Sequence, residues 1–337
     1  MAKCHQIFRL VVLRRLKSEV ELTLPAKLET LINCPLSDMQ LFFTQRLLLR
    51  SSSIINRMEQ LRASNGNITG YGDDMRKLRS LAMQLRKASN HPYLFDGAED
   101  PELQGATTDE IITSSGKMVW FDALLTQLLI KGHRVVVFSQ FTRILDIICD
   151  YLNMKSIRHC RLDGQTNPVL RQVIIDQFNR SGSRENVFVA STRAGGEGIN
   201  LQTADTVILY DSDWYIQNIL PPIHSSIARL NRFFRNPQKD IQAIGRVHRI
   251  GQLNIVHIYR LVTAGSVEER ILQRQQQKLY LDCCVTRGST AVAQAIDDEQ
   301  LDDNGNDACE QEMKEPIMKV SAVMEVLCLT SRLANGI

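Results

Sequence analysis

Val187-Phe-Val-Ala-Ser-Thr-Arg-Ala-Gly-Gly-Glu-Gly198 is the stretch that decides the fold class of this 337-residue chain. It begins with a short apolar run, which is typical of a buried strand. It passes directly into a turn with three glycines, and glycine lets the backbone come close to a ligand. Backbone amides between a strand and a helix can bind an anion. The stretch therefore predicts a strand–turn–helix unit whose turn can hold a charged group.

Similar apolar runs recur along the chain and alternate with amphipathic stretches of helical period. Asn167 followed by Pro168 is a typical start for one of these helices. Short apolar strands that alternate with helices predict an α/β fold, a parallel sheet with helices on both faces. The expected strands span residues 134–139, 157–162, 186–190, 206–210 and 255–261, and the expected helices span 118–130, 142–154, 168–179 and 266–281.

The first hundred residues carry a more helical pattern. Residues 28–32 alternate apolar and polar side chains as in a strand. Ser37-Asp-Met-Gln40 is a capping box, which predicts an amphipathic helix to about Arg50. A second helix is expected over 75–89. His91 precedes a proline and lies beside aromatic residues, which favours a packed or turn histidine over a ligand or a base.

Polar residues follow the expected strands of the sheet. In open parallel sheets ligands bind at the carboxyl ends of the strands. We therefore expect these polar residues to converge on one edge. They are Ser139 and Gln140, Asp163 and Gly164, Thr192 to Gly198, and Asp211 to Asp213.

Two arginines stand three residues apart in Gln242-Ala-Ile-Gly-Arg-Val-His-Arg-Ile-Gly-Gln252. On a helix this spacing puts the guanidinium groups of Arg246 and Arg249 on one face. Guanidinium offers a planar fork of donors that matches phosphate oxygens, so the pair is a candidate clamp for a transferring phosphoryl group. The alternative for such a pair is a solvated or salt-bridged surface.

In this order, the glycine-rich and arginine-bearing stretches resemble the fifth and sixth helicase motifs of superfamily-two ATPases. The residues of these motifs are similar to those of Swi/Snf-type chromatin remodellers, and in particular to those of their imitation-switch branch. The resemblance covers about residues 8–287 and only the second motor lobe, and it implies a RecA-like sheet preceded by a helical segment. The resemblance also rests on five other stretches: Leu13 to Val20, Gln84 to Gly97, Phe138 to Thr142, Arg161 to Thr166 and Val207 to Trp214.

The resemblance also implies a role for particular residues. Arg246 and Arg249 would contact the phosphates of ATP, and Gln242, Gly196 and Gly198 would line the nucleotide side. The DNA backbone would be contacted by Ser139, Gln140, Thr192 and Arg193. ATP with magnesium would be shared with a first lobe that supplies the phosphate loop and the metal ligands. Expected partners are double-stranded DNA, nucleosomes and remodeller subunits, in the nucleus and without a membrane.

Two stretches only superficially look like first-lobe motifs. Asp109-Glu110 could be taken for an acidic magnesium motif, but no strand precedes it. Gly116-Lys117 lacks the earlier glycine of a phosphate loop, and Met118 stands where Ser or Thr should be. With neither motif in the sequence, we expect this chain alone to show no appreciable ATP hydrolysis.

The resemblance divides the chain into four parts. Residues 1–97 are expected to be a helical brace and linker from the end of the first lobe, 98–116 a loop, 117–287 the helicase C-terminal lobe, and 288–337 an acidic, disordered tail. Residues 215–235 interrupt the family's pattern between Trp214 and Asn236. This insertion resembles translated non-coding sequence such as an unspliced intron, and a genuine loop is the alternative.

Composition fits these expectations without proving them. The net charge of +3 combines a −8 stretch at 297–315 with +11 on the rest of the chain, which suits a nucleic-acid partner and many other proteins. The eight cysteines include no CxxC pair, so neither a disulfide framework nor a metal site is indicated. The main hypothesis is that the chain is one half of a motor. Two other hypotheses stay open: a non-catalytic module that binds DNA or nucleosomes, and a truncated gene product.

Overall fold

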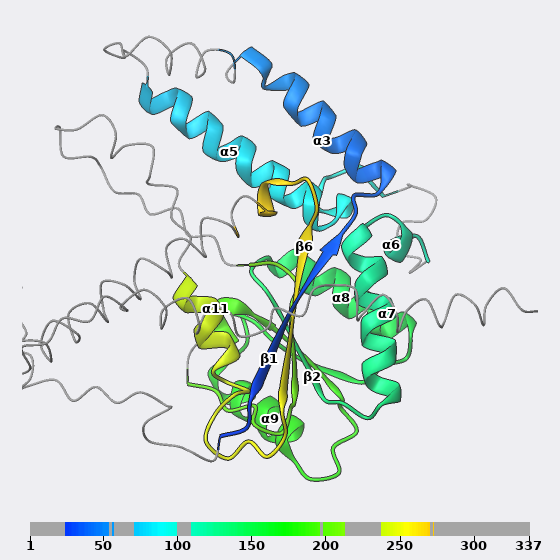
Figure 1. Cartoon of the computed structure of the whole chain (residues 1–337), viewed down its shortest axis with the longest axis vertical. Coiled ribbons are helices and arrows are strands. Elements are labelled where there is room, and N and C mark those ends of the chain that lie inside the picture. The colour runs from blue at the N-terminus through cyan, green and yellow to red at the C-terminus, as the bar shows by residue number, and fades with distance from the viewer. Residues whose placement is uncertain are drawn as a thin grey trace, which may run out of the picture.

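A six-stranded sheet with every pairing parallel forms the centre of the structure, which is a computed structural model (Figure 1). The structure describes residues 24–53, 56, 71–99, 109–195, 198–212, 237–269 and 272. The strand order is β1-β6-β5-β2-β4-β3. The strands are β1 Lys27–Cys34, β2 Val135–Ser139, β3 His159–Leu162, β4 Val187–Ser191, β5 Thr206–Leu209 and β6 Val256–Thr263.

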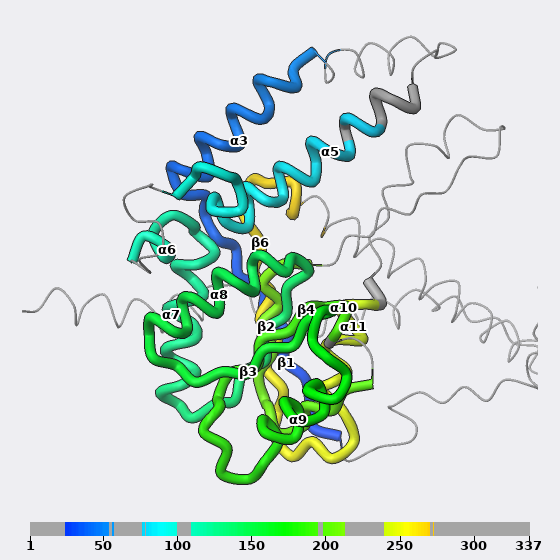
Figure 2. Tube along the Cα trace, turned by 180° about the vertical axis from the view of Figure 1, so that it is seen from behind, coloured from blue at the N-terminus to red at the C-terminus, as the bar shows by residue number. Residues whose placement is uncertain are grey.

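Helices cover both faces of the sheet, as the sequence predicts. Along β2 the side chains of Val135 and Val137 enter one apolar core, while Val136 and Phe138 enter the other. The first core packs under α7 (Gly116–Ile130) and α8 (Thr142–Met154). The second packs under α9 (Pro168–Asn179) and α11 (Pro237–Ile244), and Figures 1 and 2 show the two pairs on opposite sides.

Local sequence signals place most of these elements correctly. Helices α8 and α9 begin and end at the predicted residues. The Asn167 side chain accepts a hydrogen bond from the Val169 amide at 2.9 Å, so it caps α9 as expected. Of the helix predicted from residue 266, the described residues 267–269 and 272 are helical.

The first strand of the sheet comes from the first 97 residues of the chain. Strand β1 comes from the segment assigned to a helical brace, yet it pairs with β6 over its whole length, from Lys27 beside Val256 to Cys34 beside Thr263. Both faces of β6 are largely buried, and β1 satisfies the backbone hydrogen-bonding groups along its outer edge. The sheet therefore includes a strand from residues 1–97, the segment expected to be a helical brace and linker.

Helices α3 (Asp38–Arg50) and α5 (Tyr71–Asn90) lie side by side above the carboxyl edge of the sheet (Figures 1 and 2). The predicted capping box is present, because the Ser37 side chain accepts from the Gln40 amide and the Gln40 side chain accepts from the Ser37 amide. Gln40 is fully buried and also donates to the carbonyls of Ala88 and Ser89 at 2.9 and 2.8 Å. One side chain thus ties the start of α3 to the end of α5.

The segment 98–116, expected to be a loop, contains a short helix. Helix α6 (Glu110–Thr113) follows residues that lie outside the described part, and Gly116 is already the first residue of α7. His91 is buried beneath α6, where its Nε2 lies 2.9 Å from the Ile111 carbonyl oxygen and its Nδ1 accepts from the Tyr93 amide. His91 is therefore a packed turn histidine, as predicted.

Several expectations fall on residues that the structure does not describe. They concern residues 1–23, Gly196, the insertion 215–235 and the acidic tail 288–337. In the described part of the chain, none of the helices is long and apolar enough to cross a membrane.

Candidate functional site

The parallel strands bring the predicted DNA-contacting residues to one edge. Ser139 ends β2 and pairs in register with Ser191 at the end of β4. Gln140 therefore lies near Thr192, which begins the four-residue helix α10 (Thr192–Gly195). Asp211 follows β5 at the same edge, where its Oδ1 accepts the Gln140 amide at 2.8 Å.

These residues differ in how open they are to a partner. Ser139 is fully buried, and its Oγ accepts a hydrogen bond from the Phe141 amide at 3.2 Å. Thr192 is 2% exposed, and its Oγ1 has no hydrogen-bond partner within the described structure. The Gln140 side chain is half-buried, whereas Arg193 is exposed. Arg193 is thus the member of the predicted set that can reach a ligand without rearrangement.

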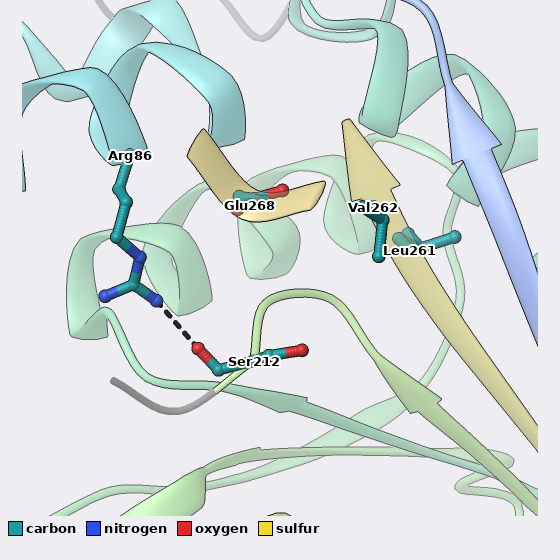
Figure 3. Close-up of a pocket in the computed structure, with 5 residues that line it drawn as sticks. All are labelled: Arg86, Ser212, Leu261, Val262 and Glu268. Atoms are coloured by element: carbon teal, nitrogen blue, oxygen red, sulfur yellow. Dashed lines mark hydrogen bonds between the residues drawn. The ribbon is translucent and has the colours of Figure 1, made fainter. Parts of the chain in front are cut away.

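Arg86 of α5 is a buried residue at this edge that was not among the predicted site residues. It is 1% exposed, and its guanidinium donates to Gln140 Oε1 at 3.0 Å and to the Ser212 carbonyl at 2.7 Å. The Arg86–Ser212 contact is drawn in Figure 3. Asp211 Oδ2 lies 3.7 Å away. Burial raises the pKa of Asp211, while the charges of Arg86 and Lys117 oppose that rise.

Lys117 occupies the position that superficially looks like a phosphate loop. Its ammonium group is fully buried and lies 2.7 Å from Glu268 Oε2, 2.8 Å from Asn90 Oδ1 and 3.0 Å from the Tyr210 carbonyl. All three donors of the lysine therefore have acceptors inside the protein. Lys117 is an anchor between α5, α7 and the residues after β6, which agrees with the rejection of Gly116-Lys117 as a nucleotide motif.

The two candidate arginines, Arg246 and Arg249, lie in a turn and not on a helix. Helix α11 ends at Ile244, and residues 245–251, which we call the arginine turn, continue as turns and bends. Gly245 follows the last helical residue, and glycine weakens helices because the unfolded backbone loses more freedom on folding. Arg246 is half-buried and Arg249 is exposed. The expectation of a shared helical face is therefore wrong, although the two residues stay close in the turn.

The arginine turn is fastened to the segment that follows Gly198. The Leu201 amide donates to the Arg246 carbonyl at 3.0 Å, and Gln252 Nε2 donates to the Ala204 carbonyl at 2.7 Å. Gly198 has a φ of +68°, which favours glycine at that position. The two stretches that carry the sequence resemblance are thus joined directly, as their predicted common role requires.

The arginine turn is separate from the edge that holds Gln140 and Arg193. His248 Nε2 lies 2.8 Å from the carbonyl oxygen of Pro25, just before the amino end of β1. Helix α11 contacts α10 and ends at Ile244, where the arginine turn begins. Gln242 on α11 and Gly198 are both exposed, so both can line a surface next to the arginine turn.

Helix α11 is held to the sheet by a buried ion cluster. Asp240 Oδ2 lies 2.9 Å from Arg260 on β6, and Arg260 also contacts Glu29 of β1 at 2.8 Å. The side chains of Asp240 and Arg260 are 1% and 8% exposed. Burial opposes the charge of Arg260, but the two carboxylates outweigh it and raise its pKa. The cluster holds α11 in place on the sheet. It therefore also sets the position of the arginine turn that follows α11.

Two protein families match this chain. The helicase conserved C-terminal domain matches residues 117–251, and the SNF2-related domain matches residues 1–94. The ISWI chromatin-remodeling complex ATPase CHR11 of Arabidopsis thaliana is 41% identical over 298 residues, which are 88% of this chain and 25% of that protein. The chain is a homologue of SNF2-type chromatin-remodelling ATPases. This agrees with the resemblance that its motifs show.

Further SNF2-type relatives give the same picture. Human SWI/SNF-related matrix-associated actin-dependent regulator of chromatin subfamily A member 1 is 42% identical over 292 residues, 87% of this chain and 25% of that protein. Yeast ISW2 is 41% identical over 286 residues, 85% of this chain and 23% of that protein. The chain spans about a quarter of the length of these ATPases.

Solved SNF2-type domains confirm the fold class. The C-terminal part of the Fun30 ATPase domain has a TM-score of 0.53 and 28% identity, and the match covers 74% of this chain and 89% of that one. The Sulfolobus solfataricus SWI2/SNF2 ATPase C-terminal domain has a TM-score of 0.51 at 22% identity over 76% of this chain and 89% of that one, which supports the fold alone. The parallel sheet is therefore a RecA-like C-terminal lobe.

Proposed function

We propose that this chain is the second motor lobe of an ATP-dependent DNA translocase that acts on nucleosomes in the nucleus. The single observation that carries the proposal is the direct joining of the Gly198 segment to the arginine turn through Leu201 and Arg246, in a chain homologous to remodelling ATPases. Arg246 and Arg249 would stabilise charge on the γ-phosphate of ATP held by a first lobe. Gln242, Gly196 and Gly198 would line the nucleotide beside them.

The metal ion of the reaction does not fit the described residues of this lobe. They hold no cluster of three His, Cys, Asp or Glu side chains that could ligate a metal. Of the described acidic residues that follow the strands, Asp211 is buried against Arg86 and Gln140, and Asp163 is paired with Arg161. We therefore assign magnesium to the ATP phosphates and to the first lobe, and assign only arginine contacts to this chain.

On the DNA side, the exposed guanidinium of Arg193 is the direct contact with a phosphate. Gln140 assists it, while buried Ser139 and Thr192 shape the two strand ends. Phosphate contacts of this kind position a protein on DNA without reading its sequence. A lobe that holds DNA in this way and closes against a first lobe can move DNA in steps past a histone core.

ATP turnover in a two-lobed protein tests this assignment. The chain is joined to the first lobe of an imitation-switch relative, and DNA-stimulated hydrolysis is measured. We expect Arg246→Ala to lower kcat by about 10³-fold or more, since arginine fingers contribute on that scale. Arg158→Ala is the matched control, because Arg158 is exposed near the amino end of β3. Residues 1–337 alone should not hydrolyse ATP, and turnover by them that Arg246→Ala abolishes would overturn the proposal.

A non-catalytic binding module is the second candidate. It is favoured by the exposed Arg193 and by the absence of a phosphate-loop motif from the 337-residue sequence. It predicts that residues 1–337 bind duplex DNA or nucleosomes on their own, with affinity that falls steeply with salt and ignores base sequence. If the two-lobed protein binds DNA but Arg246→Ala leaves its ATP turnover unchanged, this second candidate is favoured.

A further inference from the structure

Two buried arginines from distant parts of the sequence meet on one serine. Arg86 of α5 donates to the Ser212 carbonyl at 2.7 Å, and Arg260 of β6 donates to the Ser212 hydroxyl at 3.3 Å. Figure 3 shows Ser212 on the turn after β5, with the Arg86 guanidinium directed at it. Ser212 therefore links an arginine on the helical arm to an arginine in the sheet.

Each arginine has a second partner that leads to one of the two functional regions. Arg86 donates to Gln140 Oε1 at 3.0 Å, at the edge proposed to face DNA. Arg260 donates to Asp240 Oδ2 at 2.9 Å, in the helix that leads into the arginine turn. The five residues Gln140, Arg86, Ser212, Arg260 and Asp240 thus form a continuous set of hydrogen bonds, which we call the polar relay.

The polar relay is largely inaccessible to water, so its contacts cannot be exchanged freely for hydration. Arg86, Arg260 and Asp240 are 1%, 7% and 0% exposed. A buried charged group that loses a hydrogen bond without a replacement costs about 1–3 kcal/mol or more. A shift of one member is therefore expected to move its neighbours.

Arg86 also forms an ion pair with Asp211, to which it is not hydrogen-bonded in this structure. Asp211 Oδ2 is buried without a hydrogen bond in the described structure and lies 3.7 Å from the Arg86 guanidinium. A cavity of about 10 Å³, enough for one water molecule, adjoins Arg86 and Ser212 and is completed by Leu261, Val262 and Glu268. A small rotation of Arg86 would exchange Ser212 for Asp211. The coupling inferred below needs this second arrangement, because coupling between sites requires an element with two states.

We propose that Arg86, Ser212 and Arg260 are positioning residues that couple DNA bound at the Gln140 edge to the placement of the arginine turn. When a DNA phosphate engages Gln140, Arg86 turns to Asp211, and Ser212 and Arg260 adjust α11 through Asp240. This inference rests on the proposed function, because it assumes that DNA binds at that edge. It adds the path by which DNA binding changes the nucleotide side.

Hydrogen exchange in residues 1–337, with and without a 20-base-pair duplex, tests the coupling. In wild type, DNA should slow amide exchange in the peptide 239–252 by about fivefold or more, the range typical of coupled sites. Ser212→Ala removes the hydroxyl that Arg260 binds and should abolish this change, while DNA affinity stays within about twofold. Ser183→Ala is the matched control, because Ser183 bonds Glu185 in a turn before β4.

A second variant keeps the test decisive if Ser212→Ala misfolds. Asp211→Asn retains an oxygen for the Gln140 amide but removes the charge to which Arg86 would turn, so it should also abolish the DNA-induced change in exchange. DNA binding without any change at 239–252, or a change that survives both variants, overturns the coupling alone. A wild-type chain that does not bind DNA overturns the coupling together with the proposed DNA contact.

Discussion

Lys117 shows at the scale of one residue how this lobe uses buried charge. Its ammonium joins Asn90, Tyr210 and Glu268, which lie up to 151 residues from Lys117 in the sequence. A buried ion pair is not strongly stabilising by itself, but removal of one partner leaves the other charge uncompensated. The residue therefore makes the packing of α7 dependent on the segment after β6.

We expect Lys117→Met to lower the free energy of unfolding by about 3 kcal/mol or more, the cost typical of a broken buried pair. Urea denaturation followed by circular dichroism measures it. The control Lys131→Met alters an exposed lysine at the end of the same helix and should change stability by about 0.5 kcal/mol or less. In the double variant Lys117→Met with Glu268→Gln, part of the loss should be regained. A single variant as stable as wild type would show that the pair is dispensable.

His91 should make stability depend on pH. Burial lowers the pKa of His91 to about 4, opposed by the hydrogen bond to Ile111, against 6.5 for a free histidine. Below pH 6.5 the unfolded chain takes up a proton that the folded protein does not, so stability falls as the pH drops towards 4. The full effect is about 3 kcal/mol.

Unfolding of wild type and His91→Asn between pH 7.5 and 4.5 isolates this contribution. Asparagine can still cap the turn at Tyr93 but does not titrate. The stability difference between the two proteins should therefore shrink as the pH falls. Equal slopes for the two proteins would mean that His91 is not the titrating group.

The burial and contacts of single side chains were the features hardest to predict from the sequence. Gln140 and Arg246 could be predicted as site residues, because they lie inside recognisable motifs. Arg86 also lies in such a stretch, but nothing local indicates that it is buried against residues 54 and 126 positions away. The burial of Ser139 and Thr192 likewise follows from packing of neighbouring strands, which a motif does not encode.

At the scale of elements, Gln40 is the junction between three helices. Its side chain caps α3, donates to the last turn of α5 and accepts from the Gly116 amide at the start of α7 at 3.1 Å. Gly116 is required there, because a Cβ would lie 1.7 Å from the Pro35 carbonyl oxygen. The arm formed by α3 and α5 is thus joined to the lobe at a closely packed point.

Gln40→Ala should destabilise the protein by about 3 kcal/mol, since it leaves several buried backbone groups without partners at about 1–3 kcal/mol each. Gln45→Ala, at an exposed position on the same helix, is the matched control. The measurement is urea unfolding, with amide exchange of residues 84–90 as a local readout. If α5 exchanges as slowly as in wild type, the junction does not hold the arm.

The elements themselves were largely predictable, for reasons that their residues make plain. Helix α9 has an Asn cap and Pro168, and β2 is a run of apolar residues that ends in Ser139, so local signals suffice. Strand β1 was predicted but its place in the sheet was not, because its partner β6 lies more than 200 residues later. The end of α11 was missed because the helical spacing of Arg246 and Arg249 continues past the point where Gly245 allows the chain to turn.

At the scale of the whole molecule, the charge distribution and the sheet's polarity agree with the proposed DNA contact at one edge. The body carries +11 apart from the acidic stretch 297–315, and Arg193 is exposed where β4 ends. Long-range attraction from such a body raises the rate of association with DNA, and the individual phosphate contacts then fix position. Salt dependence separates these two contributions, because each phosphate contact releases bound counterions from the duplex.

The logarithm of the DNA association constant for residues 1–337 should therefore fall linearly with the logarithm of salt concentration. Arg193→Ala should reduce the magnitude of that slope by about 1, the effect of one lost phosphate contact. Arg184→Ala removes the same charge from an exposed position before the amino end of β4, so it should leave the slope nearly unchanged. Fluorescence anisotropy with two duplexes of unrelated sequence gives the slopes, and the two duplexes should agree. If Arg184→Ala lowers the slope as much as Arg193→Ala, binding depends on net charge alone, and the carboxyl edge of the sheet loses its assigned role.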